Sequence, residues 1–196
     1  MTLRLQPDPA TAAAWRAFWQ MAEARLTDDS AGASLALHAL MPLASDHPTR
    51  TVIVAVDAVA DAVVEWSDEL GKNPACMAET CFTMLHGQLA PPERLLLFAA
   101  YQTLLAIDPT GEAGSPHQVC HPWPPHAGVA SLATAAQGGV LQQALTAASQ
   151  THGLEQHPAL VLCNAAPEVL TQILWGRSRS DPEQMGRLLA AKKNLA

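Results

Sequence analysis

The sequence predicts an all-α fold: an irregular bundle of about seven or eight helices in a single domain, 1–196, with one long proline-rich elbow at about 108–126. Apolar residues make up 49% of the chain and aromatic residues only 5%. Much of the apolar fraction is Ala and Leu, which lose little side-chain entropy in a helix. Apolar side chains also recur every three or four positions, which is the spacing of one helix face. A chain of this length buries enough surface to fold without a disulfide or a metal.

Proline and capping residues mark the predicted helices of the first half of the chain. Helices are expected at about 8–26, 30–42, 50–70, 73–86 and 91–107. Pro42 leaves the end of the second helix undefined, because proline has no amide donor. The third begins with the β-branched run 51–56, which is also typical of a strand, but helical spacing continues to Trp66 without a turn residue. We therefore expect one long helix there, closed by Gly71.

Beyond residue 107 the sequence changes character. Prolines and glycines exclude a helix at 108–126, and a loop of this length is typical of a functional or flexible segment. An Ala-rich helix is expected at about 127–151, followed by a short apolar segment at 159–163. Pro167 is expected to open the next helix, which ends at 176. For the last helix, Ser180 and the glutamate three residues later have the spacing of a capping box.

Charge and hydropathy narrow the classes of partner. The formal net charge is −7, with 18 acidic and 11 basic residues, so we expect no nucleic-acid binding. The basic residues within 177–193 fit the last turn of a C-terminal helix. The longest apolar stretches, 52–64 and 95–107, are interrupted by polar residues, so we expect no membrane span. The start of the chain has no signal-peptide pattern, and its four cysteines are typical of reduced thiols, which predicts a cytoplasmic location.

The elbow carries a cluster of side chains that ligate metals in other proteins. These are His117, Cys120, His121 and His126. Zinc favours such donors, but their spacing matches no standard zinc motif. One interpretation is an elbow that packs Trp123 against the helices, leaves its histidines solvated and needs no cofactor. The alternative is a metal- or small-molecule-binding protein that uses the cluster together with His152 or His157.

Acidic residues line one face of the helix expected at 50–70. Asp57, Asp61 and Glu65 follow one another at four-residue steps, and Asp68 and Glu69 extend this acidic stripe. The simplest interpretation is a solvated helix face. A di-iron bundle is excluded, because the chain contains no Glu-x-x-His pair. A further interpretation is that the acidic stripe, together with Trp66 and Trp123, docks a partner protein with a basic surface.

The remaining motifs point away from catalysis. The chain has no nucleophile elbow, phosphate-binding loop or dinucleotide fingerprint, so we expect no enzymatic activity and no catalytic residue. Cys76 and Cys81 lie five residues apart, on different helix faces, and are expected to be buried and unreactive. Trp66 and Trp175 are candidate anchors for a partner. Two further candidates, Trp15 and Trp19, fit the core better.

The order of the helices, the elbow sequence Pro122-Trp123-Pro124-Pro125-His126 and the Ala-rich stretch 127–148 resemble an uncharacterised family of bacterial helical proteins often encoded beside type VI secretion genes. The chain departs from the family pattern at Asp57 and Asp61, where the family has a more aromatic segment. The resemblance implies an accessory or adaptor role and identifies no functional residue.

The function that we expect is a non-enzymatic protein–protein interaction module: an adaptor, chaperone or immunity-like protein of the bacterial cytoplasm. Metal or small-molecule binding by the elbow is the alternative. Homodimerisation stays open, since so Ala-rich a helix needs a partner to cover it.

Overall fold

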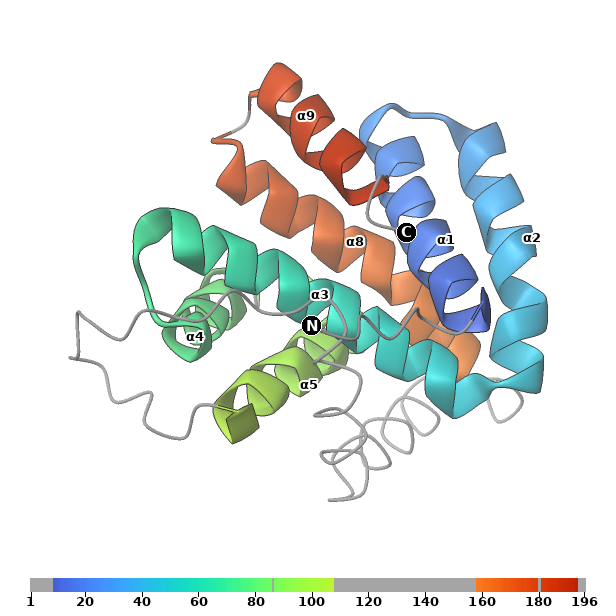
Figure 1. The fold of residues 1–196 in the computed structure, drawn as a ribbon, viewed down its shortest axis with the longest axis horizontal. Coiled ribbons are helices and arrows are strands. Elements are labelled where there is room, and N and C mark those ends of the chain that lie inside the picture. The colour runs from blue at the N-terminus through green and yellow to red at the C-terminus, as the bar shows by residue number, and fades with distance from the viewer. Residues whose placement is uncertain (1–8, 86, 108–157, 180, 194–196) are drawn as a thin grey trace, which may run out of the picture.

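Seven α-helices account for most of the residues that the structure describes, 9–85, 87–107, 158–179 and 181–193, in a computed structural model (Figure 1). They are α1 (Pro9–Leu26), α2 (Ser30–Asp46), α3 (Pro48–Leu70), α4 (Pro74–Leu85), α5 (Pro91–Ile107), α8 (Pro158–Arg177) and α9 (Pro182–Lys193). These ranges contain no strand, which confirms the all-α prediction. The predicted elbow and the Ala-rich helix at 127–151 lie outside the described residues.

Local capping interactions explain why the helices of the first half begin and end where the sequence predicted. At the start of α2 the Asp29 carboxylate accepts a hydrogen bond of 2.9 Å from the backbone amide of Gly32. Before α4 the Asn73 side-chain oxygen accepts one of 2.8 Å from the Ala75 amide. Gly71, with φ of 61°, closes α3 in the left-handed conformation that glycine adopts without steric cost. Each cap supplies a partner for backbone groups that the helix leaves unpaired at its end.

The prediction of a helix start at Pro167 is wrong. In the structure α8 is continuous through Pro167, the segment 159–163 forms part of its first turns, and α2 likewise continues past Pro42. A proline inside a helix costs about 3 kcal/mol. Leu162 and Leu170, on either side of Pro167, are almost fully buried, and each such side chain contributes about 1.5–3 kcal/mol. Burial on both sides therefore outweighs the local cost of the proline.

The β-branched start of α3 is helical, as predicted. Its valines, including Val54 and Val56, are buried against neighbouring helices. The hydroxyl of Thr51 donates to the backbone oxygens of Leu43 and His47, each at 2.9 Å, and so links the end of α2 to the first turn of α3. Packing on several sides overrides the β propensity of this run.

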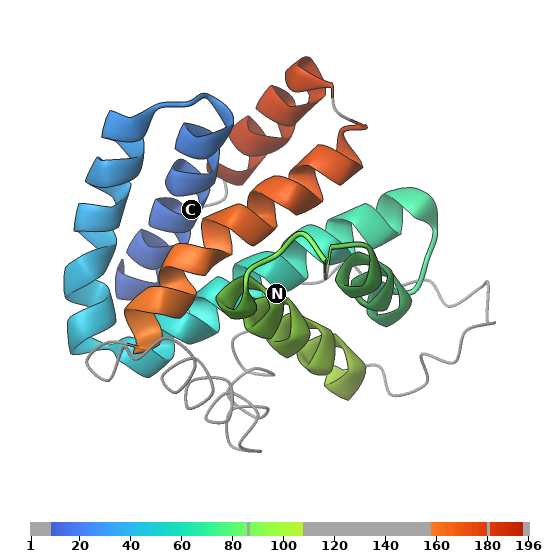
Figure 2. The same ribbon diagram turned by 180° about the vertical axis from the view of Figure 1, so that it is seen from behind.

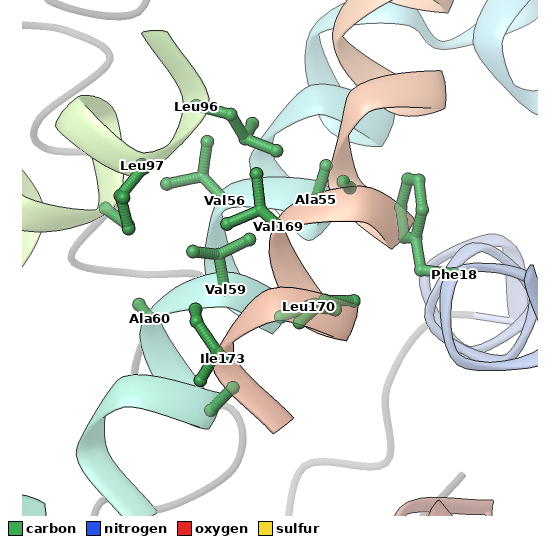
Figure 3. Packing of buried hydrophobic residues seen from close by; sticks show 14 of the residues in the cluster. Phe18, Ala55, Val56, Val59, Ala60, Leu96, Leu97, Val169, Leu170 and Ile173 are labelled. Carbon is green, nitrogen blue, oxygen red and sulfur yellow. The ribbon is translucent and has the colours of Figure 1, made fainter. Parts of the chain in front are cut away.

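Helices α3 and α8 run side by side through the middle of the bundle (Figures 1 and 2). Helices α1, α2 and α9 lie on one side of this pair, and α4 and α5 lie on the other. Figure 3 shows Val56 and Val59 of α3 beside Val169 and Ile173 of α8, where Leu96 approaches from α5. The pair thus forms the centre of the core, and residues 54–64 of α3 are enclosed by the neighbouring helices.

One helix of the described residues, Ala159–Arg177, is long and apolar enough by length and composition to cross a membrane. It lies outside the two longest apolar stretches of the sequence, 52–64 and 95–107. In the fold, 56% of the most apolar stretch of this helix is buried within the protein. A helix at the centre of a bundle needs the same apolar composition.

Candidate functional site

The first two residues of the acidic stripe of α3 are turned into the protein. Asp57 is 2% exposed and Asp61 is 7% exposed, so the interpretation of a solvated face is wrong for these two residues. Glu65 is half-buried, whereas Asp68 and Glu69 lie on the surface. The buried part of the stripe therefore has to find its counter-charges within the chain.

Lys192, in the last turn of α9, supplies one of these counter-charges. Its ammonium group donates hydrogen bonds to the carboxylates of Asp61 and Glu65, and its side chain is only 2% exposed. The ammonium nitrogen also lies 5.4 Å from the centre of the Trp19 ring on α1, within the range of a cation–π contact. We call Asp57, Asp61 and Glu65 the acidic socket, because Lys192 pairs with Asp61 and Glu65 and its charge also acts on Asp57.

Arg177, at the end of α8, supplies the second counter-charge. One terminal nitrogen of its guanidinium donates to Glu65 at 2.5 Å and the other donates to Glu69 at 2.7 Å. Burial acts to lower the pKa of Arg177, but the hydrogen bonds and charges of Glu65 and Glu69 raise it above its ordinary value. The guanidinium fork thereby ties α8 to two successive turns of α3.

The four carboxylates at this site outnumber the two cations, and the excess falls on Asp57. Burial, reinforced by the charge of Asp61, raises the pKa of Asp57 to about 7, although Lys192 opposes the shift. The Oδ1 atom of Asp57 has no hydrogen-bond partner, and neither does the indole nitrogen of Trp19. Asp57 is therefore a carboxyl group that holds its proton up to near neutral pH.

The pKa values of the other two members of the acidic socket, Asp61 and Glu65, shift in opposite directions. Burial raises the pKa of Asp61, and the ammonium group of Lys192 opposes this effect. Burial also acts to raise the pKa of Glu65, but Lys192 and Arg177 together lower it below its ordinary value. The cations thus hold Glu65 ionised, while the interior of the protein favours a neutral Asp57.

Cys81 on α4 and Cys163 on α8 are fully buried, and burial raises the pKa of each thiol to about 12. These two buried thiols are unreactive, because the thiolate is the nucleophilic form. For Cys81 this agrees with the sequence prediction, whereas Cys76 is only half-buried.

Three aromatic side chains meet where α4 contacts α5; Phe98 is exposed, whereas Phe82 and Tyr101 are half-buried against the core. The ring centres of Phe82 and Phe98 lie 5.9 Å apart, and those of Phe98 and Tyr101 lie 6.3 Å apart. Phe98 is 41% exposed, and Met84, elsewhere on α4, is 53% exposed. We call Phe82, Phe98 and Tyr101 the aromatic patch. It holds the chain's single tyrosine and two of its three phenylalanines, yet nothing in the sequence analysis singled it out.

Trp15 and Trp19 lie in or against the core, as the sequence suggested, and the candidate anchor Trp66 also packs against it. Trp19 is fully buried, and Trp15 is half-buried with its ring centre 6.1 Å from that of Trp19. Trp66 is also half-buried and covers Gly176 of α8 so closely that a Cβ atom there would lie 2.7 Å from the ring. Trp175 is 46% exposed. Trp123 lies outside the described residues.

A hollow of about 530 Å³ lies where α1 meets α2, and its lining includes Glu23, Thr27, Asp29 and Leu35. The Thr27 hydroxyl donates to the Glu23 backbone oxygen at 2.9 Å, and the Asp29 carboxylate accepts from the Gly32 amide at 2.9 Å. The Thr27 hydroxyl and the Asp29 carboxylate thus cap the ends of α1 and α2.

The described residues contain no group of three His, Cys, Asp or Glu side chains that could hold a metal ion. The candidate ligands of the elbow, His117, Cys120, His121 and His126, all lie outside the described residues, as do His152 and His157. The metal-binding alternative therefore stays a prediction.

Fold and site together define an all-α bundle in which buried ion pairs join α3 to the C-terminal helices. No family model, curated protein or solved structure matches the chain. The function has to be argued from the surface and from the site themselves.

Sequence reasoning missed the role of Lys192, although one signal was present. Leu188, Leu189 and Lys192 lie three, four and seven positions after Met185, so the lysine continues the apolar face of the last helix. A lysine at such a position is buried only when an acid receives it. That acid lies 131 residues away in the sequence, which local spacing does not reveal.

Proposed function

We propose that this chain is a non-enzymatic helical protein–protein interaction module and that the aromatic patch is a contact surface for its partner. The observation that carries the proposal is the exposure of Phe98 between Phe82 and Tyr101. Aromatic side chains are enriched among the residues that dominate binding energy, because they bury a large area at a small entropic cost. In a chain with only 5% aromatic residues, an exposed phenylalanine flanked by two further aromatic rings supports a binding role.

Charge supports a partner with a basic surface. The chain carries a net charge of −7, and Asp68 and Glu69 are exposed at the end of α3. Opposite charge steers two proteins together and selects against partners of like charge. A cytoplasmic location also belongs to this proposal and is supported by the missing signal-peptide pattern and the cysteine content. An adaptor or accessory role beside a bacterial secretion system belongs to it as well and derives from the sequence resemblance alone.

The proposal is tested by affinity capture from cells of the source organism with purified full-length chain as bait. Phe98→Glu places a charge in the aromatic patch and is expected to abolish capture of the partner. Leu35→Glu is the matched control, because Leu35 is 73% exposed on α2 and the substitution adds the same charge. Far-ultraviolet circular dichroism establishes that both variants retain the helical fold.

The proposal requires that wild type and Leu35→Glu both capture the same protein and that Phe98→Glu fails to capture it. Its direct affinity for each purified variant is then measured by calorimetry. Loss of a central aromatic contact is expected to weaken binding by about 2 kcal/mol or more. Equal affinity for wild type and Phe98→Glu would contradict a role of the aromatic patch.

A further inference from the structure

Helix α2 lies at the edge of the bundle, beside α1 (Figures 1 and 2). Leu35 is 73% exposed, the highest fraction among the large apolar side chains of the described residues. Ala31 and Ala39, one turn before and after it, are exposed as well, and we call these three residues the uncovered face of α2. A leucine left this far in water adds little to the fold of its own chain, but it contributes to binding when another molecule covers it.

The hollow between α1 and α2 opens beside the uncovered face. Its volume is about 530 Å³, and its lining includes Leu35 and the buried side chains of Ala24 and Ala36. The hollow is larger than a leucine side chain, and it lies next to one that projects into solvent. A surface that carries both a projecting side chain and a hollow is complementary to a second copy of itself, because a two-fold contact uses the same surface of both copies.

The charge distribution favours a second copy as the occupant of the uncovered face. Residues 30–45 contain no Asp, Glu, Lys or Arg, although the whole chain carries a net charge of −7. Two such faces meet without bringing like charges together, whereas a basic partner finds no counter-charge on the helix.

The acids that precede α2 select an antiparallel arrangement of the two helices. Asp28 and Asp29 are exposed at its amino end. In an antiparallel pair centred on Leu35, they lie opposite the uncharged Pro42 and Met41 of the second copy, whereas a parallel pair would bring the acids of both copies together. The dipoles of two antiparallel helices also attract one another.

We propose that the uncovered face of α2 is a homodimer interface, in which the two helices run antiparallel about a two-fold axis and each Leu35 enters the hollow of the other copy. This inference does not depend on the proposed binding of a partner. The aromatic patch belongs to α4 and α5, on the other side of the α3–α8 pair, and stays exposed in the dimer. A dimer presents two aromatic patches, which strengthens binding to a partner that itself has two sites.

The test is sedimentation velocity of the purified full-length chain at concentrations up to about 100 μM, which covers homodimers of moderate affinity. Wild type is expected to shift from monomer towards dimer as the concentration rises. Leu35→Glu is expected to weaken dimerisation at least about tenfold, because each dimer then buries two like charges without counter-charges. Phe98→Glu adds the same charge to the aromatic patch and is the control, which is expected to dimerise as wild type does.

A second variant alters the same face at another position. Ala39→Glu is one turn beyond Leu35 and is also expected to weaken dimerisation. Both positions are exposed in the single chain, so neither substitution touches the core. Circular dichroism establishes the fold of each variant, and Ala39→Glu decides the test if Leu35→Glu does not fold.

Three results would overturn the proposal. One is a wild-type chain that stays monomeric at every concentration, and another is equal dimerisation of Leu35→Glu and wild type. The third is loss of the dimer in Phe98→Glu but not in Leu35→Glu, which would place the interface at the aromatic patch. Leu35→Glu retains the aromatic patch and is expected to capture the partner as a monomer, so this proposal and the proposed function are decided separately.

Discussion

Replacing Asp57 by asparagine is expected to stabilise the protein above neutral pH. The folded state raises the pKa of this carboxyl from its ordinary value of 3.8 to about 7, chiefly by burial. Between these two values the folded protein holds a proton that the unfolded chain has lost. The contribution of Asp57 to stability therefore falls as the pH rises from about 4 to about 7, and it stays low at higher pH. Asparagine cannot ionise and does not undergo this loss.

The magnitude follows from the two pKa values. Each tenfold difference in proton affinity between the folded and unfolded states corresponds to about 1.4 kcal/mol, so a pKa raised from 3.8 to about 7 corresponds to about 4 kcal/mol. This is an upper bound for Asp57→Asn at pH 8, because the amide oxygen inherits the unpaired position of Oδ1. Near pH 4 the two proteins are expected to have similar stability.

The assay is urea unfolding followed by far-ultraviolet circular dichroism, repeated at intervals from about pH 4 to about pH 9. The decisive quantity is the difference in unfolding free energy between Asp57→Asn and wild type at each pH, which is expected to grow with pH. Asp68→Asn, on the exposed part of the same helix, is the control and is expected to change stability by less than about 0.5 kcal/mol. A difference for Asp57→Asn that does not vary with pH would refute the reasoning.

Three further predictions concern packing, charge and reactivity. Gly176→Ala is expected to destabilise the protein by about 1–3 kcal/mol in urea unfolding, because the new methyl group would meet the Trp66 ring. Gly186→Ala is the control and is expected to be neutral or stabilising, because a Cβ atom at that position has open space. Asp61→Ala is expected to cost about 1–3 kcal/mol, because Lys192 loses one of its two carboxylate partners and keeps Glu65; unchanged or higher stability would contradict a stabilising buried ion pair. The two buried thiols are expected to resist alkylation in the native protein and to react after unfolding, as mass mapping would reveal; rapid native labelling would contradict their burial.

The element boundaries were largely predictable because short-range chemistry sets them. Asp29, Asn73 and Gly71 cap helices through atoms a few residues away, and their residue types alone announce such caps. The prediction of a helix start at Pro167 was wrong because the cost of an interior proline is local, whereas the burial that offsets this cost comes from contacts with other helices.

The candidate site was harder to predict for the same reason. The four-residue steps of Asp57, Asp61 and Glu65 correctly placed them on one helix face, but the spacing does not say whether water or protein covers that face. Lys192 and Arg177 pack against this face of α3, and both lie more than a hundred residues further along the chain. The aromatic patch likewise forms only when α4 and α5 come together.

The most direct test of the central claim, that Lys192 lies in the acidic socket, is the reactivity of individual amines in the native protein. Brief acetylation with an amine-specific ester, followed by mass mapping, compares Lys192 with the exposed Lys72. The account predicts that Lys192 reacts at least about tenfold more slowly than Lys72 and that the difference disappears in urea. Equal reactivity of the two lysines in the native protein would contradict it.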